Sequence, residues 1–229
     1  MTGPAGAPAI PAPGFADPTR DAQRAFRAVL DALAHPTRSY PLSGPARSPA
    51  ALGRGLAAVA LTLLDEDCST WLGGSLGADA ECAAWLGFHT GTRLVAEPAD
   101  AQFVLADPRS LPPLAQLRRG TDEAPHRSAT VLLDVRGCTG TARFRAAGPG
   151  IDGATGLAAP WADAEFLPQW TANTATFPRG VDLLLVDEDA IAALPRTTRL
   201  HAVGPAPIGS ASTHSTSAPS ASTRPTQEA

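Results

Sequence analysis

Apolar residues recur every three or four positions near the start of the chain, between residues 22 and 33. These positions form one stripe: Ala22, Ala25, Phe26, Val29, Leu30 and Leu33. The spacing predicts an amphipathic helix from about Pro18 to Ala34, with Asp17 as its N-cap. His35-Pro36 ends the helix, because the residue before a proline disfavours helical backbone angles.

Weaker patterns predict three further helices. They cover Pro49 to Leu63, Ala78 to Phe88 and Asp163 to Ala172. Gly53 and Gly55 weaken the first of these by about 1 kcal/mol each relative to alanine.

Five shorter apolar segments are bounded by Gly, Pro or Asp and predict β-strands. The runs Val131-Leu132-Leu133 and Leu183-Leu184-Leu185 are continuously apolar, which is typical of strands covered on both faces. Because strands and helices are interspersed, we expect an α/β layered fold rather than a helix bundle or a β-sandwich. The predicted strands are Thr70 to Leu72, Ala101 to Leu105, Thr130 to Val135, Ala142 to Ala147 and Val181 to Val186.

Both ends of the chain have a composition that disfavours folding. Residues 1–14 are almost all Ala, Pro and Gly, and residues 204–229 are rich in Ser, Thr, Pro and Ala. Such segments bury too little apolar surface to offset an ordering entropy of roughly 1–2 kcal/mol per residue. We therefore expect two disordered tails and a single domain over residues 15–203.

All eighteen basic residues are arginine, and the chain contains no lysine. Without lysine the chain can form neither a Schiff base with pyridoxal phosphate nor a Walker A phosphate loop. The formal net charge is −4, and no basic run is interleaved with aromatic residues. We therefore expect no nucleic-acid partner.

The three cysteines, Cys68, Cys82 and Cys138, are an odd number without tight spacing. They argue against a disulfide framework and suit a reducing compartment. The sequence has neither a signal-peptide pattern nor an apolar run long enough to span a membrane. We expect a soluble cytoplasmic protein that does not contact membranes.

Gly73-Gly74-Ser75-Leu76-Gly77 matches the nucleophile-elbow pattern of α/β-hydrolases. With Asp182 or Asp187 and then His201, the chain order would suit a catalytic triad. However, a hydrolase elbow follows several strands of the sheet, and few strands can precede Ser75. A glycine-rich turn is therefore the favoured interpretation, and a serine hydrolase using Ser75 is the alternative.

Three further motifs have simpler structural explanations, so we expect no bound metal or cofactor. The Gly148–Gly153 segment satisfies the dinucleotide pattern G-x-G-x-x-G, but a poor helix start follows it, so we expect a turn. Cys68, Cys82 and His89 match no compact zinc site, and we expect structural thiols. The acidic runs at 65–67 and 187–189 suit turns and caps better than Mg²⁺ binding.

Arginines and threonines flank the last predicted strand. Arg179, Arg196, Thr197 and Thr198 offer planar guanidinium donors and hydroxyls that suit an anion such as phosphate, or a carboxylate of a partner. The alternative is structural: Arg196 bridges a carboxylate such as Asp182, and the threonines form an edge strand. The sequence alone leaves both interpretations open.

Several short segments occur in a characteristic order along the chain. They are Asp21–Arg27 with Leu30, His35-Pro36, Ala60–Asp65, Trp71-Leu72, Phe88–Gly91, Gln102-Phe103, Gly120-Thr121, Ala129–Leu132, Gly148–Ile151, Phe177–Asp182 and Leu194–Thr198. Their order and combination resemble the PhnH family, a subunit of bacterial carbon–phosphorus lyase. The resemblance extends over nearly all of residues 17–203, and its strongest part is 177–182 together with 194–198.

The resemblance implies a three-layer αβα domain similar to the large domain of pyridoxal-phosphate-dependent transferases, without their cofactor site. It also implies assembly with the G, I and J subunits of carbon–phosphorus lyase, and a homodimer when isolated. The family's complex forms alpha-D-ribose 1-methylphosphonate 5-triphosphate from ATP and methylphosphonate in phosphonate catabolism. The family supplies no catalytic residue to transfer to this chain, so we expect an accessory or structural subunit of a transferase complex.

Overall fold

The computed structural model describes residues 14–203 and is built around a seven-stranded mixed sheet. Five neighbouring strands are parallel (β3, β2, β4, β5 and β8). The sheet continues with β9, which is antiparallel to β8, and then β1, which is antiparallel to β9. Apart from residue 14, the predicted disordered tails lie outside the described residues. Across the sheet the strands are β1 (Tyr40–Pro41), β9 (Ala190–Leu194), β8 (Asp182–Val186), β5 (Thr130–Asp134), β4 (Phe103–Ala106), β2 (Ser69–Leu72) and β3 (Arg93–Leu94).

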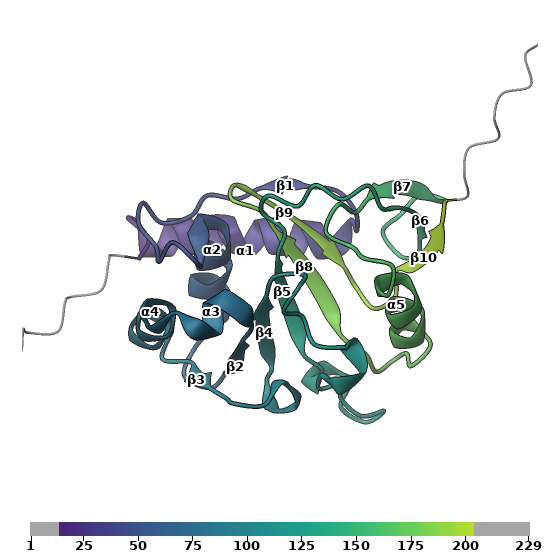
Figure 1. Ribbon diagram of the computed structural model, residues 1–229. Helices are drawn as coiled ribbons and strands as arrows, with labels where there is room; N and C mark the ends of the chain where they lie inside the picture. Colours follow the sequence, from purple (N-terminus) through teal and green to yellow (C-terminus); the bar gives the residue numbers. More distant parts are fainter. Residues whose placement is uncertain (1–13, 204–229) are drawn as a thin grey trace, which may run out of the picture.

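Helices cover one face of this sheet, and a helix with a small second sheet covers the other (Figure 1). The first layer holds α1 (Pro18–Ala34), α2 (Gly53–Leu63), α3 (Gly74–Ala78) and α4 (Ala80–Thr90). The opposite layer combines α5 (Phe166–Thr174) with the antiparallel strands β10 (Arg199–Ala202), β6 (Arg143–Ala147) and β7 (Thr155–Ala158). Single 3₁₀ turns lie at η1 (Pro98–Asp100), η2 (Leu114–Gln116) and η3 (Pro125–Arg127). The mixed α/β class is confirmed, whereas the second outer layer is only partly helical.

Successive residues of the central strands point into two separate cores. Leu132 and Leu184 contact the α1–α4 layer, whereas Val131, Leu133 and Leu183 contact the layer of α5 and the small sheet. All five are essentially inaccessible to solvent. Full burial of one such side chain stabilises the fold by about 1.5–3 kcal/mol. The continuous apolar runs are therefore strands covered on both faces, as the sequence predicts.

Some residues of the apolar stripe predicted for α1 are buried in the core, and others are exposed to solvent. The helix packs on α2 and β9 through small residues, with Ala25, Ala28 and Ala32 buried. Phe26 and Leu30 are instead 47% and 49% exposed. Val29 and Leu33 of the same stripe also pack into the core, so only Phe26 and Leu30 among its larger apolar side chains lie on the outer surface.

Several predicted boundaries shift in the structure. The helix predicted over 49–63 begins at Gly53. The one predicted over 78–88 covers Ala80–Thr90, after Asp79 as its N-cap, whose carboxylate accepts a hydrogen bond from the Glu81 amide (2.8 Å). The short helix α3 before it was not predicted. Strands β1, β3, β7, β9 and β10 were not predicted. Strands β1 and β3 have only two residues each, β7 and β10 mix apolar with polar residues or glycine, and β9 is rich in alanine, which is depleted in strands. None of the helices in residues 14–203 is long and apolar enough to cross a membrane.

Cys82 is a fully buried thiol on α4. Burial, assisted by the negative charge of Asp79, raises its pKa to about 11. Burial also raises the pKa values of Cys68 and Cys138, and all three cysteines are free thiols.

We expect the free energy of unfolding to fall as the pH rises from about 9 to about 11, because the unfolded chain releases the Cys82 proton first. The shift of roughly two pKa units corresponds to a loss of up to about 2–3 kcal/mol. Urea unfolding across this range should therefore give a shallower pH dependence for Cys82→Ala than for the wild type. Equal slopes for the two proteins would contradict the assignment.

Candidate functional site

The two strongest resemblance segments meet at the amino end of β8. Residues 177–182 enter β8, and residues 194–198 leave β9, which pairs with β8 in antiparallel orientation, Leu183 opposite Leu194. This pairing brings Asp182 beside Arg196, and the Arg196 amide donates to Asp182 Oδ1 (2.7 Å). Residues fourteen positions apart in the chain thus form one polar cluster.

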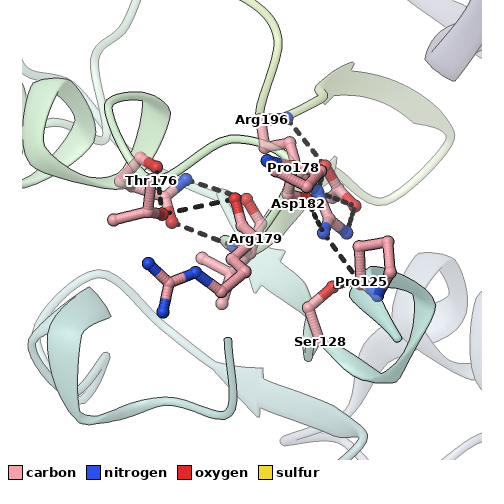
Figure 2. Close-up of polar contacts among 9 residues, drawn as sticks. Pro125, Ser128, Thr176, Pro178, Arg179, Asp182 and Arg196 are labelled. Atoms are coloured by element: carbon pink, nitrogen blue, oxygen red, sulfur yellow. Dashed lines mark hydrogen bonds and ion pairs between the residues drawn. The ribbon is translucent and has the colours of Figure 1, made fainter. Parts of the chain in front are cut away.

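The guanidinium of Arg196 joins the start of β8 to two loops (Figure 2). Its Nε donates to Asp182 Oδ1 (3.1 Å), and its Nη2 pairs with Asp182 Oδ2. Its Nη1 donates to the carbonyls of Pro125 (3.0 Å) and Pro178 (3.2 Å). All three guanidinium nitrogens are therefore engaged within the chain, and the predicted bridge from Arg196 to Asp182 is confirmed.

Asn173 of α5 holds the start of β8 in a second way. Its side-chain amide donates to the Val181 carbonyl and accepts from the Val181 amide, both at 2.9 Å, and the residue is buried. Gly180 has a φ of +119°, and a Cβ there would lie 2.9 Å from Asn173 Oδ1. Sequence reasoning missed Asn173, because a lone asparagine in a helix gives no signal that it pairs with a strand eight residues away.

The remaining predicted residues of this segment separate into buried and exposed groups. Thr198 is fully buried, and its carbonyl accepts from the Trp170 indole (2.8 Å). Its amide bonds to the Pro195 carbonyl (2.8 Å) and closes a turn, so the predicted threonine edge strand is wrong and β10 begins only at Arg199. Arg179 is exposed, pairs with Asp122 (3.2 Å) and is directed away from Arg196 (Figure 2).

Thr197 contributes to a surface hollow of about 490 Å³ beside this cluster. The hollow lies between the carboxyl-terminal turn of α5 and the start of β10. Its lining comprises Pro149, Thr171, Thr174, Ala175, Phe177, Arg196, Thr197 and Arg199. We refer to it as the Phe177 hollow.

A second hollow, of about 570 Å³, lies at the opposite edge of the sheet, beyond the carboxyl ends of β4 and β5. Ligands of open parallel sheets commonly bind at this edge. Three carboxylates and two guanidiniums line it, belonging to Asp107, Asp134, Asp163, Arg109 and Arg136. This excess of negative charge does not favour a phosphate or a phosphonate. The sequence signal for this edge was an acidic residue directly after each buried strand.

Arg136 joins three elements at this carboxyl edge. Its Nε (2.9 Å) and Nη2 (2.7 Å) bind the two oxygens of Asp134, and Nη2 also donates to the Ala51 carbonyl (2.7 Å). The hydrogen bonds to Asp134 raise the pKa of Arg136 above the ordinary value of an arginine. Gly53 has a φ of +66° and lies against the guanidinium, so a side chain there would displace Arg136.

The hydrolase triad is not assembled. Ser75 lies at the start of α3, after the carboxyl end of β2, whereas Asp182 begins β8 at the amino edge of the same parallel sheet. Asp187 follows β8 at the carboxyl edge, but two strands separate β8 from β2, which gives roughly 14 Å between them. His201 belongs to β10 in the other sheet, opposite Arg145.

The other motifs serve local structure. The Gly148–Gly153 segment is a turn leading into β7, as predicted. Asp65 accepts from the Asp67 amide (3.0 Å), and the Asp187 amide bonds to the Ala190 carbonyl (2.9 Å) to close the β8–β9 turn. Within residues 14–203 no group of three His, Cys, Asp or Glu side chains could hold a metal ion.

Comparison of the sequence with known proteins shows the family to which the chain belongs. The family model described as "Bacterial phosphonate metabolism protein (PhnH)" matches residues 13–201, which is most of the chain. This chain is a member of the PhnH family. Its PhnH-type segments 177–182 and 194–198 are those that converge on the Arg196–Asp182 pair.

Two relatives of this PhnH chain extend the comparison. The alpha-D-ribose 1-methylphosphonate 5-triphosphate synthase subunit PhnH of Rhizobium meliloti (strain 1021) is 38% identical over 187 residues, covering 81% of this chain and 93% of the relative. A putative C-P lyase subunit protein HtxG of Stutzerimonas stutzeri is 35% identical over 182 residues, covering 80% of this chain and 87% of the relative.

Replacing Arg196 by methionine should lower the free energy of unfolding by about 2–4 kcal/mol, because the part-buried Asp182 carboxylate loses its cation. Adding Asp182→Leu should restore part of this loss, since no unpaired charge then remains. The matched control is Arg179→Met, whose exposed ion pair with Asp122 contributes about 0–1 kcal/mol. Urea denaturation measures the free energy of unfolding of Arg196→Met, of the double variant and of Arg179→Met. An Arg196→Met protein as stable as the control would contradict the structural role.

Proposed function

We propose that this chain is a subunit of a carbon–phosphorus lyase complex that forms alpha-D-ribose 1-methylphosphonate 5-triphosphate from ATP and methylphosphonate. The observation that carries the proposal is the 38% identity to the R. meliloti synthase subunit over 93% of that protein's length. The match to HtxG, a putative C-P lyase subunit, supports the same system.

Within the complex the chain has an accessory or structural role and acts through partner subunits. Its candidate nucleophile Ser75 lies far from Asp182, and the Arg196 guanidinium is fully engaged in holding loops. The chain contains no lysine, so a Schiff base with pyridoxal phosphate is chemically impossible. We propose one domain over residues 15–203, similar to the large domain of pyridoxal-phosphate-dependent transferases but without that cofactor.

The partners we propose are the G, I and J subunits of carbon–phosphorus lyase, and in their absence a second copy of the chain. Binding of a partner would involve only some of the four candidate residues Arg179, Arg196, Thr197 and Thr198. Arg196 and Thr198 hold the fold behind the surface. We propose that Arg179, which is exposed, and Thr197, which lines the Phe177 hollow, contact a partner. We place the complex in the cytoplasm.

Co-expression tests the proposal directly. A tagged chain should co-purify with the G, I and J subunits from its own phosphonate system, and mass spectrometry should detect the ribose methylphosphonate triphosphate when ATP and methylphosphonate are supplied. Omitting this chain should abolish the product. A chain that never associates with these subunits, or a product that forms equally well without it, would refute the proposal.

Ser75→Ala separates this role from the hydrolase alternative. Because Ser75 is exposed and lacks nearby triad partners, the variant should assemble and support product formation like the wild type. A purified chain that cleaves a p-nitrophenyl ester, and loses this activity in Ser75→Ala, would favour the hydrolase instead.

A further inference from the structure

Phe177 is a large apolar side chain held on the surface by an otherwise rigid segment. It is 63% exposed. The residues after it are fixed, since the Pro178 carbonyl accepts from Arg196 and Val181 pairs with Asn173. Phe177 also lines the Phe177 hollow beside Arg199. Exposed aromatic side chains on a fixed backbone are typical anchors of protein interfaces.

Three arginines without an acidic partner belong to segments that meet the chain after Phe177. Arg199 lines the hollow with Phe177, and Arg127 ends the η3 turn, where the Pro125 carbonyl accepts from Arg196. Within residues 14–203, Arg119, Arg127 and Arg199 form no ion pair. Of the nearby acids, Asp122 and Asp182 pair with Arg179 and Arg196, which leaves the Glu123 carboxylate against these three guanidiniums. The Arg119 carbonyl accepts from the Gly180 amide (3.0 Å), so its loop lies directly beside the segment that follows Phe177. The surface is therefore locally positive on a chain whose formal net charge is −4.

Arg119 and Arg199 approach α5 from two sides. Arg119 lines a small hollow together with Ala172 and Asn173, and Arg199 lines the Phe177 hollow together with Thr171 and Thr174. The last turn of α5 lies between them, and its carboxyl-terminal dipole disfavours a small anion in the hollow. A second copy related by a two-fold axis would bring like-charged arginines together. Neither a small anion nor a second copy suits this surface well.

We infer that the surface formed by Phe177, Arg199, Arg119 and Arg127 is the docking site for an acidic segment of another subunit of the complex. An apolar side chain of that segment packs against Phe177 in the hollow, and its carboxylates face Arg199 and Arg119. The inference rests on the proposed function, because it identifies the surface through which the chain joins the assembly.

Variants of exposed residues test the surface without altering the fold. Phe177→Ser and Arg199→Glu remove the anchor and reverse the charge. Phe88→Ser on α4, where Phe88 is 65% exposed, and Arg93→Glu on β3 are matched controls on another part of the molecule. Thermal unfolding should give similar midpoints for all four variants and the wild type, because none of these side chains is buried.

Binding to a purified assembly of the G, I and J subunits is then measured by calorimetry. We expect Phe177→Ser and Arg199→Glu each to weaken binding at least about 10-fold, and each control to change it less than about 2-fold. Salt should weaken wild-type binding more than Arg199→Glu binding, since the variant has lost an attractive charge.

Three results would overturn the inference. If the wild type binds and both Phe177→Ser and Arg199→Glu bind equally well, the docking surface lies elsewhere and the proposed function stands. If these variants lose only the self-association of the isolated chain, the surface is a homodimer interface. If the wild type itself does not bind the assembly, the proposed function fails and the inference with it.

Discussion

The ion pair between Arg196 and Asp182 determines how the last third of the chain closes onto the sheet. The Arg196 guanidinium pairs with the carboxylate of Asp182, the first residue of β8, and donates to the carbonyls of two loops, at Pro125 and Pro178. The pair therefore gives the loops at the amino end of β8 a common anchor beside the β8–β9 hairpin. The exposed position of Phe177 follows from this arrangement, since the next residue along the chain is part of it.

Arg136 plays the corresponding role at the opposite edge of the sheet. It binds Asp134 at the end of β5, the Ala51 carbonyl before α2 and, more weakly, Glu188 after β8. The two central parallel strands are thus held by an arginine at each end. Arginine suits both positions, because its planar fork can satisfy a carboxylate and a carbonyl at once.

Much of this architecture could be predicted from sequence. Strands β5 and β8 were evident from Val131-Leu132-Leu133 and Leu183-Leu184-Leu185, and α1 from its regular spacing. The exposure of Phe26 and Leu30 could not be predicted, since a helical stripe does not reveal which of its residues meet the core. Strands β1 and β3 have only two residues each and form because neighbours lie beside them. Strand β9 is apolar but rich in alanine, which by itself gives little strand signal.

The candidate site was predictable to a similar extent. The Arg196–Asp182 bridge was one of two interpretations of the sequence, and the hairpin register brings the two residues together. The contact of Asn173 with Val181 could not be foreseen, because it depends on how α5 packs against β8. Likewise, the hollow beyond β4 and β5 is formed by loops near residues 107, 136 and 162, which are far apart in the chain.

The main sheet ends on both sides in a strand of only two residues, β1 and β3, and β1 contains a proline. A strand this short exposes few free backbone amides and carbonyls, and proline removes one donor altogether. An incoming chain therefore finds almost no backbone edge with which to extend this sheet. Any assembly through the main sheet must depend on side chains, so partner choice is set by shape and charge and can be altered one residue at a time.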